Sequence, residues 1–147
     1  MFLIFASFAN ATIVAASLDP AGLAQLSDGY VQGVVLDAAP RWSDGAIWTV
    51  ARVEDARGWV SEVWLRGGCI QSVCMTVAGA PVVDEGDEVY VFLRGREPTS
   101  LSQGLFHLHG DEAVRDTATL AVAQGPKPVA RYPLAELEWA AARLPRR

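Results

Sequence analysis

The sequence predicts a mainly β fold: a small antiparallel barrel of five or six strands, with a short N-terminal helix and a C-terminal helix. Short runs of β-branched and aromatic residues recur along the chain, turn residues separate them, and helical patterns occur only near the ends. The most informative run is the apolar segment 89–93, between the acidic turn 84–88 and Arg94-Gly95. Such a run indicates a central strand buried on both faces, so Val91 should be buried.

The other elements follow from local signals. Asp19 followed by Pro20 is typical of a helix N-terminus, and the helix should place Leu23 and Leu26 on the sheet. Gly33 lies inside an expected strand and indicates a bulge or a bend there. Loops are expected at 37–45 and 97–104, and the remaining strands at 12–18, 30–36, 47–53, 59–65, 75–77, 105–109 and 117–123.

Length and composition predict a single domain with its own core. The chain has 147 residues, of which 51% are hydrophobic. We assign the barrel to residues 12–124, and a linker with the C-terminal helix to residues 125–147. Pro133 suits the first turn of that helix, while Glu136 and Arg143 suit its positive and negative ends.

Charge and motif content exclude several classes of function. The net charge is −5 and the basic residues form no stripe, which argues against a nucleic acid partner. After the N-terminal segment no run approaches the roughly 18 apolar residues of a membrane-spanning helix, so we expect no stable membrane span. Ser43 and Ser100 lack a nucleophile motif and a partner base. We therefore expect a protein that is not an enzyme and has no cofactor.

The first eleven residues indicate export. Residues 1–9 are apolar apart from Ser7, and Ala9-Asn10-Ala11 fits the small-x-small pattern of a signal-peptidase site. Cleavage there would leave Thr12 as the first residue, in a periplasmic or secreted protein. The segment is short and has no Lys or Arg before its apolar core, so a buried first strand remains the alternative.

A strand bent at a glycine, a meander and a return strand favour an OB-like barrel, or its netrin-like variant with a terminal helix. An immunoglobulin-like sandwich is the alternative, and the two closely spaced cysteines do not support it. Short motifs follow in order over residues 29–108: Gly33-Val34-Val35, Trp42 with Asp44-Gly45, Ile47-x-Thr49, Gly67-Gly68, Gly79-x-Pro81, Glu85-Gly86, Val89-x-Val91-Phe92-Leu93 and Gln103-Gly104-Leu105-Phe106.

This series resembles an uncharacterised family of exported bacterial proteins with OB-like barrels. The chain departs from the family pattern at Arg57-Gly58, where a Lys-Gly turn is usual, and in its two cysteines. Some members resemble proteins encoded beside secreted zinc proteases. The resemblance therefore implies an exported binding or accessory domain, in its most specific form a partner or inhibitor of a secreted protease. It transfers no catalytic residue, because the pattern consists of turn glycines and core positions.

Cys69 and Cys74 have three interpretations. In an exported protein two cysteines most simply form a disulfide. Two free buried thiols, or a metal or redox role, are the alternatives, although neither a common zinc spacing nor C-x-x-C is present. Because the closed loop is short, the disulfide should stabilise the fold by less than about 3 kcal/mol.

Two polar clusters could bind a metal. His107 and His109 point to the same face of an expected strand, and with Asp111 or Glu112 they could form a two-histidine, one-carboxylate site. A metal-binding protein or metalloenzyme is therefore the alternative function, and a solvent-facing strand is the simpler interpretation of the pair. The carboxylates of residues 84–88 could bind calcium, but they lack the spacing of a calcium loop and fit a solvated turn.

The tryptophans are the candidate contacts for a protein partner. Trp42, Trp59 and Trp139 are expected to be exposed, and exposed tryptophan is favoured at interface hot spots. The alternative for Trp42 is that it covers the open end of the barrel. Trp48 and Trp64 lie within expected strands and are assigned to the core.

Overall fold

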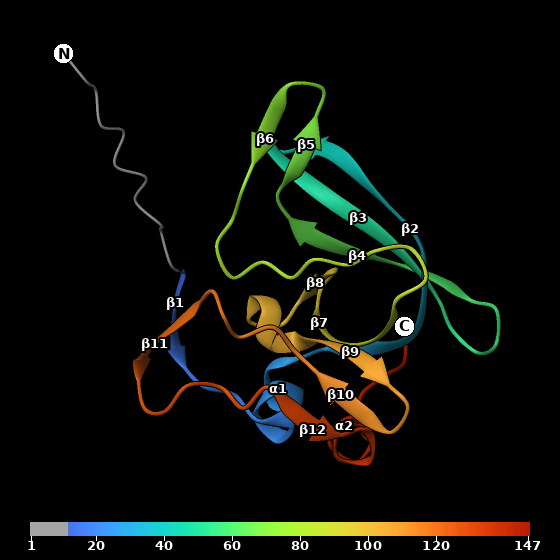
Figure 1. Ribbon diagram of the computed structural model, residues 1–147. Helices are drawn as coiled ribbons and strands as arrows, with labels where there is room; N and C mark the ends of the chain where they lie inside the picture. The colour runs from blue at the N-terminus through green and yellow to red at the C-terminus, as the bar shows by residue number, and fades with distance from the viewer. Residues whose placement is uncertain (1–11) are drawn as a thin grey trace.

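The computed structural model describes residues 12–147 as a β-rich protein with helices near the N-terminal side and at the C-terminus (Figure 1). The helices are α1 (Pro20–Leu26), the 3-10 helix η1 (Leu101–Gly104) and α2 (Leu134–Ala141). The strands are β1 (Thr12–Ala16), β2 (Gly29–Ser43), β3 (Ala46–Glu54), β4 (Val60–Arg66), β5 (Gly68–Ile70), β6 (Val73–Met75), β7 (Glu88–Arg94), β8 (Glu97–Pro98), β9 (Leu105–His109), β10 (Glu112–Val114), β11 (Leu120–Gln124) and β12 (Arg131–Pro133). The expected signal segment, 1–11, lies outside the described residues.

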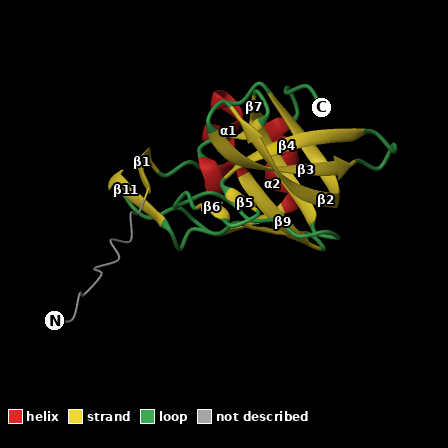
Figure 2. Cartoon of the chain, turned by 90° about the horizontal axis from the view of Figure 1, so that it is seen from above, coloured by secondary structure: helices red, strands yellow, loops and turns green. Residues whose placement is uncertain are grey.

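The main sheet has the order β12-β10-β9-β7-β2-β3-β4, with β8 paired to β7, and all its pairs are antiparallel. The β5–β6 hairpin and the parallel pair β1–β11 form two small separate sheets, and the β1–β11 pair lies apart from the main sheet (Figure 2). The expected closed barrel of five or six strands is therefore wrong in strand number and in closure. Across the gap, β4 makes one backbone hydrogen bond, from the Trp64 N–H to the Arg96 carbonyl (2.8 Å), and no ladder forms.

Strand β7 is central, as predicted, and is buried on both faces. It pairs with β2 on one side and with β9 on the other. Val89, Val91 and Leu93 face one hydrophobic core, which the inner face of the β2–β3–β4 sheet completes. Tyr90 and Phe92 face a second core beneath the two helices. The alternation of side chains along one strand thus divides the protein into two apolar layers.

The helices cover the second core. Leu23 of α1 and Leu137 and Ala141 of α2 are fully buried there. The Asp19 carboxylate accepts a hydrogen bond from the Gly22 N–H at 2.8 Å, so the predicted N-cap is confirmed. Leu26, however, is half exposed. Leu26 is the last residue of α1, and there it lines a surface groove.

The expected loop at 37–45 is mostly strand. Strand β2 continues to Ser43 and reverses at Asp44-Gly45, whose φ angles of 49° and 75° suit a tight hairpin turn. The register shift of β2 lies between Val35 and Asp37 and not at Gly33. Gly33 is required for another reason, since a Cβ there would lie 2.1 Å from the Glu54 carbonyl oxygen.

The segment 97–104, expected to be a flexible connection, is instead packed. It forms β8 and η1, and Thr99, Ser102 and Gln103 are buried. The Gln103 side chain accepts a hydrogen bond from the Leu18 N–H and donates one to the Ala16 carbonyl. These polar contacts hold the N-terminal segment against η1, so the connection is ordered by hydrogen bonds that no hydrophobic pattern reveals.

Arg115 is buried without a carboxylate partner among residues 12–147. Burial lowers the pKa of its guanidinium from the ordinary value. The group lies over two aromatic rings, at 5.2 and 5.4 Å from their centroids. It donates to the carbonyl oxygens of Leu18 (2.8 Å), Gln103 (3.0 Å) and Val129 (2.8 Å). One side chain therefore joins three segments that lie far apart in the sequence.

The double burial of β7 predicts the effect of a charge at its centre. Val91→Asp should prevent folding, because an unpaired buried carboxylate costs more than the stability of a small domain. Val82→Asp is the matched control, since Val82 is one of the most exposed apolar side chains. Circular dichroism melting should show no cooperative transition for Val91→Asp and a normal one for Val82→Asp. A soluble, cooperatively melting Val91→Asp protein would refute the assignment of β7.

Candidate functional site

Arginine and tryptophan side chains gather on the outer face of β2, β3 and β4. We call this set, Arg41, Trp48, Trp64, Arg66 and Arg96, the Trp-Arg surface. The Trp48 and Trp64 rings meet edge to face, with their centroids 5.9 Å apart. The Arg41 and Arg96 guanidiniums lie over Trp64 at 5.2 and 5.5 Å, and that of Arg66 lies over Trp48 at 5.2 Å. Each contact is a cation–π interaction, so the surface is ordered in the absence of any partner.

The assignment of Trp48 and Trp64 to the core is wrong. Both are half-buried, and they lie on the face opposite the core residues Val63 and Leu65. Strand alternation separates the two faces, and the sequence pattern alone does not identify the inner one. The cross-strand register places Arg41, Trp48 and Arg66 side by side on three adjacent strands. The sequence signal for this surface was the repeated Trp and Arg at alternate positions of neighbouring strands.

The charges of the surface are partly balanced. Arg41 lies 3.6 Å from the Glu62 carboxylate, and Arg66 pairs with Glu97 at 2.8 Å. In the described part of the chain, Arg94 and Arg96 have no carboxylate partner. The outer face therefore carries unpaired positive charge beside aromatic rings, in a protein whose net charge is −5.

Trp59 is presented by the rigid turn that precedes β4. The buried Asp55 carboxylate accepts hydrogen bonds from the backbone N–H groups of Arg57 (2.8 Å) and Trp59 (3.0 Å). It also pairs with the Arg57 guanidinium at 2.8 Å, and Arg146 lies 3.5 Å away. Burial acts to raise the pKa of Asp55, but the hydrogen bonds from Arg57 and Trp59 outweigh it and lower that pKa.

The three tryptophans predicted to contact a partner are exposed but do not form one surface. Trp42 is 60% exposed, Trp59 69% and Trp139 77%. Trp42 and Trp59 flank opposite ends of β3, and at about 3.4 Å per residue this strand separates them by more than 20 Å. Trp139 lies on α2, which packs on the second core. Of the three, Trp59 directly precedes a strand of the Trp-Arg surface.

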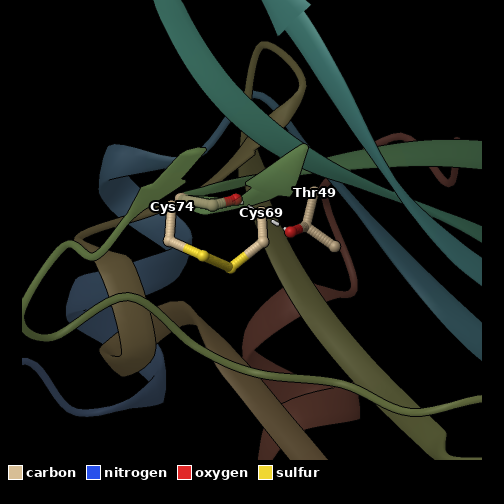
Figure 3. Close-up of a disulfide and its surroundings, with 4 residues drawn as sticks. Thr49, Cys69 and Cys74 are labelled. Carbon is tan, nitrogen blue, oxygen red and sulfur yellow. Dashed lines mark hydrogen bonds between the residues drawn. A yellow bond between two sulfur atoms is a disulfide. The ribbon is translucent and has the colours of Figure 1, made fainter. Parts of the chain in front are cut away.

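The cysteines form a disulfide, which confirms the first of the three interpretations (Figure 3). Cys69 and Cys74 are paired directly across the β5–β6 hairpin, and their Cα atoms are 4.1 Å apart. The chain reverses at Gln71, whose φ of 54° is left-handed, and this turn brings the two residues together. The hairpin borders an apolar groove of about 290 Å³.

A second groove, of about 740 Å³, lies where β4, β8 and η1 meet. Arg66, Arg94 and Glu97 contribute its polar groups, and Leu26 and Leu101 line its apolar part. Ser100 and Leu101 have consecutive φ angles of 56° and 57°. A left-handed backbone at two successive non-glycine residues is strained, and such strain often occurs at functional sites. The groove thus adjoins the Trp-Arg surface through Arg66.

The histidines do not assemble a metal site within residues 12–147, where no group of three or more His, Cys, Asp or Glu is arranged to hold an ion. His107 Nε2 lies 3.3 Å from the Asp87 carboxylate, and His109 is exposed. That carboxylate also accepts the Asp84 N–H at 2.8 Å, within the acidic turn. No helix among the described residues is long and apolar enough to cross a membrane.

The Asp55 turn predicts a pH dependence of stability. Because the folded pKa of Asp55 lies below its ordinary value of 3.8, its contribution is present above that pH and is lost as the pH falls through the lower folded pKa. Urea unfolding between pH 2 and 7 should show Asp55→Asn less stable than wild type at neutral pH, with the difference shrinking below about pH 4.

Asp37→Asn is the matched control for this prediction. Asp37 pairs with Arg52 on the surface, and an exposed pair contributes about 1 kcal/mol or less. The stability of this variant should follow that of wild type closely across the pH range. A constant difference between Asp55→Asn and wild type from pH 2 to 7 would contradict the hydrogen-bonded, ionised role of Asp55.

Comparison of the chain with protein-family models, with curated proteins and with solved structures found no match. The resemblance to exported OB-like proteins therefore stays a prediction.

Proposed function

We propose that this protein is an exported binding or accessory domain that acts through a protein partner and not through catalysis. The observation that carries the proposal is the Trp-Arg surface, together with the exposed Trp59 that directly precedes β4. Tryptophan and arginine are the residue types most enriched at interface hot spots. Here stacking holds the side chains of the Trp-Arg surface in place, and the Asp55 hydrogen bond fixes the backbone of Trp59. Binding a partner would therefore cost this protein little side-chain entropy at that surface.

The disulfide supports export, because disulfides persist in oxidising compartments such as the periplasm and the cell exterior. The strand order supports an open OB-like arrangement as the finer description of the fold, since β2 lies between β7 and β3 and carries a bulge. Both fit the family that the sequence resembles. On that resemblance, a secreted zinc protease is the most specific form of the partner.

Partner capture from culture supernatant, followed by titration of the captured protein, tests the proposal. Trp59→Ser should weaken binding by about thirtyfold, the effect of losing one hot-spot side chain worth about 2 kcal/mol. Trp139→Ser is the matched control, because Trp139 is equally exposed but lies on α2. If the partner is a protease, hydrolysis of its substrate should change when wild-type protein is added.

Equal affinity of wild type and Trp59→Ser for the captured protein would contradict the proposed surface. Metal analysis of the purified protein tests the alternative function, metal binding through His107 and His109. Stoichiometric zinc or copper in the purified protein, lost in the double His→Ala variant, would favour that alternative over a binding domain.

A further inference from the structure

Strand β4 leaves one edge of the main sheet open. The Gly67 N–H donates to the Ile47 carbonyl of β3, whereas the Trp64 N–H points away and donates to the Arg96 carbonyl. Backbone groups alternate in direction along a strand, so those of Val60 and Glu62 also point away from β3. In the described part of the chain they have no backbone partner. This edge is a template for one more strand.

The far end of the same edge is positively charged. The Arg96 carbonyl holds Trp64, while the Arg96 guanidinium stacks on the Trp64 ring without a carboxylate partner in residues 12–147. Arg94 lines the adjoining groove, in which Arg66 is already paired with Glu97. Glu62, the one acidic side chain on β4, is already engaged by Arg41 and by the Trp64 indole N–H. An incoming strand therefore meets the available guanidiniums of Arg94 and Arg96, whereas the Glu62 carboxylate is already paired.

We propose that the β4 edge binds an extended, acidic segment of the partner protein by strand addition. The proposal rests on the proposed function and names the chemistry of the recognised segment. The partner backbone pairs with the N–H and C=O groups of Val60 and Glu62. Its acidic side chains pair with Arg96 and Arg94, since guanidinium–carboxylate contacts are strong and directional. Trp59, directly before the edge, packs against the apolar side chains of the added strand.

The backbone half of the proposal has a specific test, because Glu62→Pro removes an N–H that β3 does not use. Proline is tolerated on an edge strand in that orientation, and circular dichroism melting verifies that the variant is folded. Glu62→Thr is the matched control, since it removes the same carboxylate and keeps the N–H. The difference between the two variants therefore isolates the backbone donor.

The probe is a fluorescein-labelled peptide of alternating valine and glutamate, compared by fluorescence anisotropy with its valine–lysine counterpart. Wild type and Glu62→Thr should bind the glutamate peptide with similar affinity. Glu62→Pro should bind the glutamate peptide about tenfold more weakly than wild type does, because one backbone hydrogen bond is lost. Wild type should bind the lysine peptide about tenfold more weakly than the glutamate peptide, because the guanidinium–carboxylate contacts are lost. The double variant Arg94→Ala/Arg96→Ala should reduce the preference for glutamate over lysine.

Equal binding of the glutamate and lysine peptides, or equal binding by Glu62→Pro and Glu62→Thr, would overturn the proposal. If Glu62→Pro fails to fold, a glutamate peptide N-methylated at alternate residues tests the same hydrogen bonds, and undiminished binding of it is the contrary result. A β4–β4 dimer, dissociated by Glu62→Pro in sedimentation experiments, would show that a second copy occupies the edge instead.

The failures of the two proposals are distinguishable in the capture assay. If the captured partner depends on Trp59 but is unaffected by Glu62→Pro, the strand-addition proposal fails while the binding function stands. If the partner is indifferent to Trp59→Ser, the proposed surface itself fails, whatever the peptides do.

Discussion

The burial of β7 on both faces is the constraint on which the rest of the structure depends. Its valines and Leu93 need an apolar layer on one side, and Tyr90 and Phe92 need another on the opposite side. Each such side chain contributes about 1.5–3 kcal/mol when fully buried, so neither layer can be omitted. Strand β2 meets this requirement by pairing with β7 along Gly29–Val34 and with β3 along Val34–Ser43. The helices cover the remaining face because the second core would otherwise be exposed to water.

The position of the candidate site follows from the outer face of β3 and β4 and from the edge at which the main sheet ends. Once the inner face of β3 and β4 is filled by core residues, strand alternation places Trp48 and Trp64 outside. Because the sheet is not closed, β4 keeps an edge that, among residues 12–147, one hydrogen bond to Arg96 covers only in part. Stacked arginines then order Trp48 and Trp64, and the Asp55 hydrogen bonds fix the backbone of the turn that precedes β4. Fold and surface thus share one cause, an open sheet wrapped around a single central strand.

The sequence predicted the elements that carry strong local signals and missed those fixed by tertiary contacts. The apolar runs of β3, β7 and β9 and the Asp19 cap were found because pattern and capping are local. The sequence did not predict that β2 continues beyond residue 36, because Pro40 and its neighbours are typical of a loop. Pairing of this segment with β3 makes it a strand. Arg115 gave no signal, since its partners are backbone carbonyls of three distant segments. The exposed tryptophans were predicted, but their distribution over separate surfaces needed the fold.

Native-state hydrogen exchange of the β7 amides tests the central claim most directly. If both cores depend on this strand, the amides that β7 donates to β2 and β9 should exchange only through global unfolding, with the largest free energy of opening in the protein. The amides of the β5–β6 hairpin, which forms a separate sheet, should open at lower free energy. Exchange of the β7 amides by local opening, well below the free energy of unfolding measured in denaturant, would contradict the account.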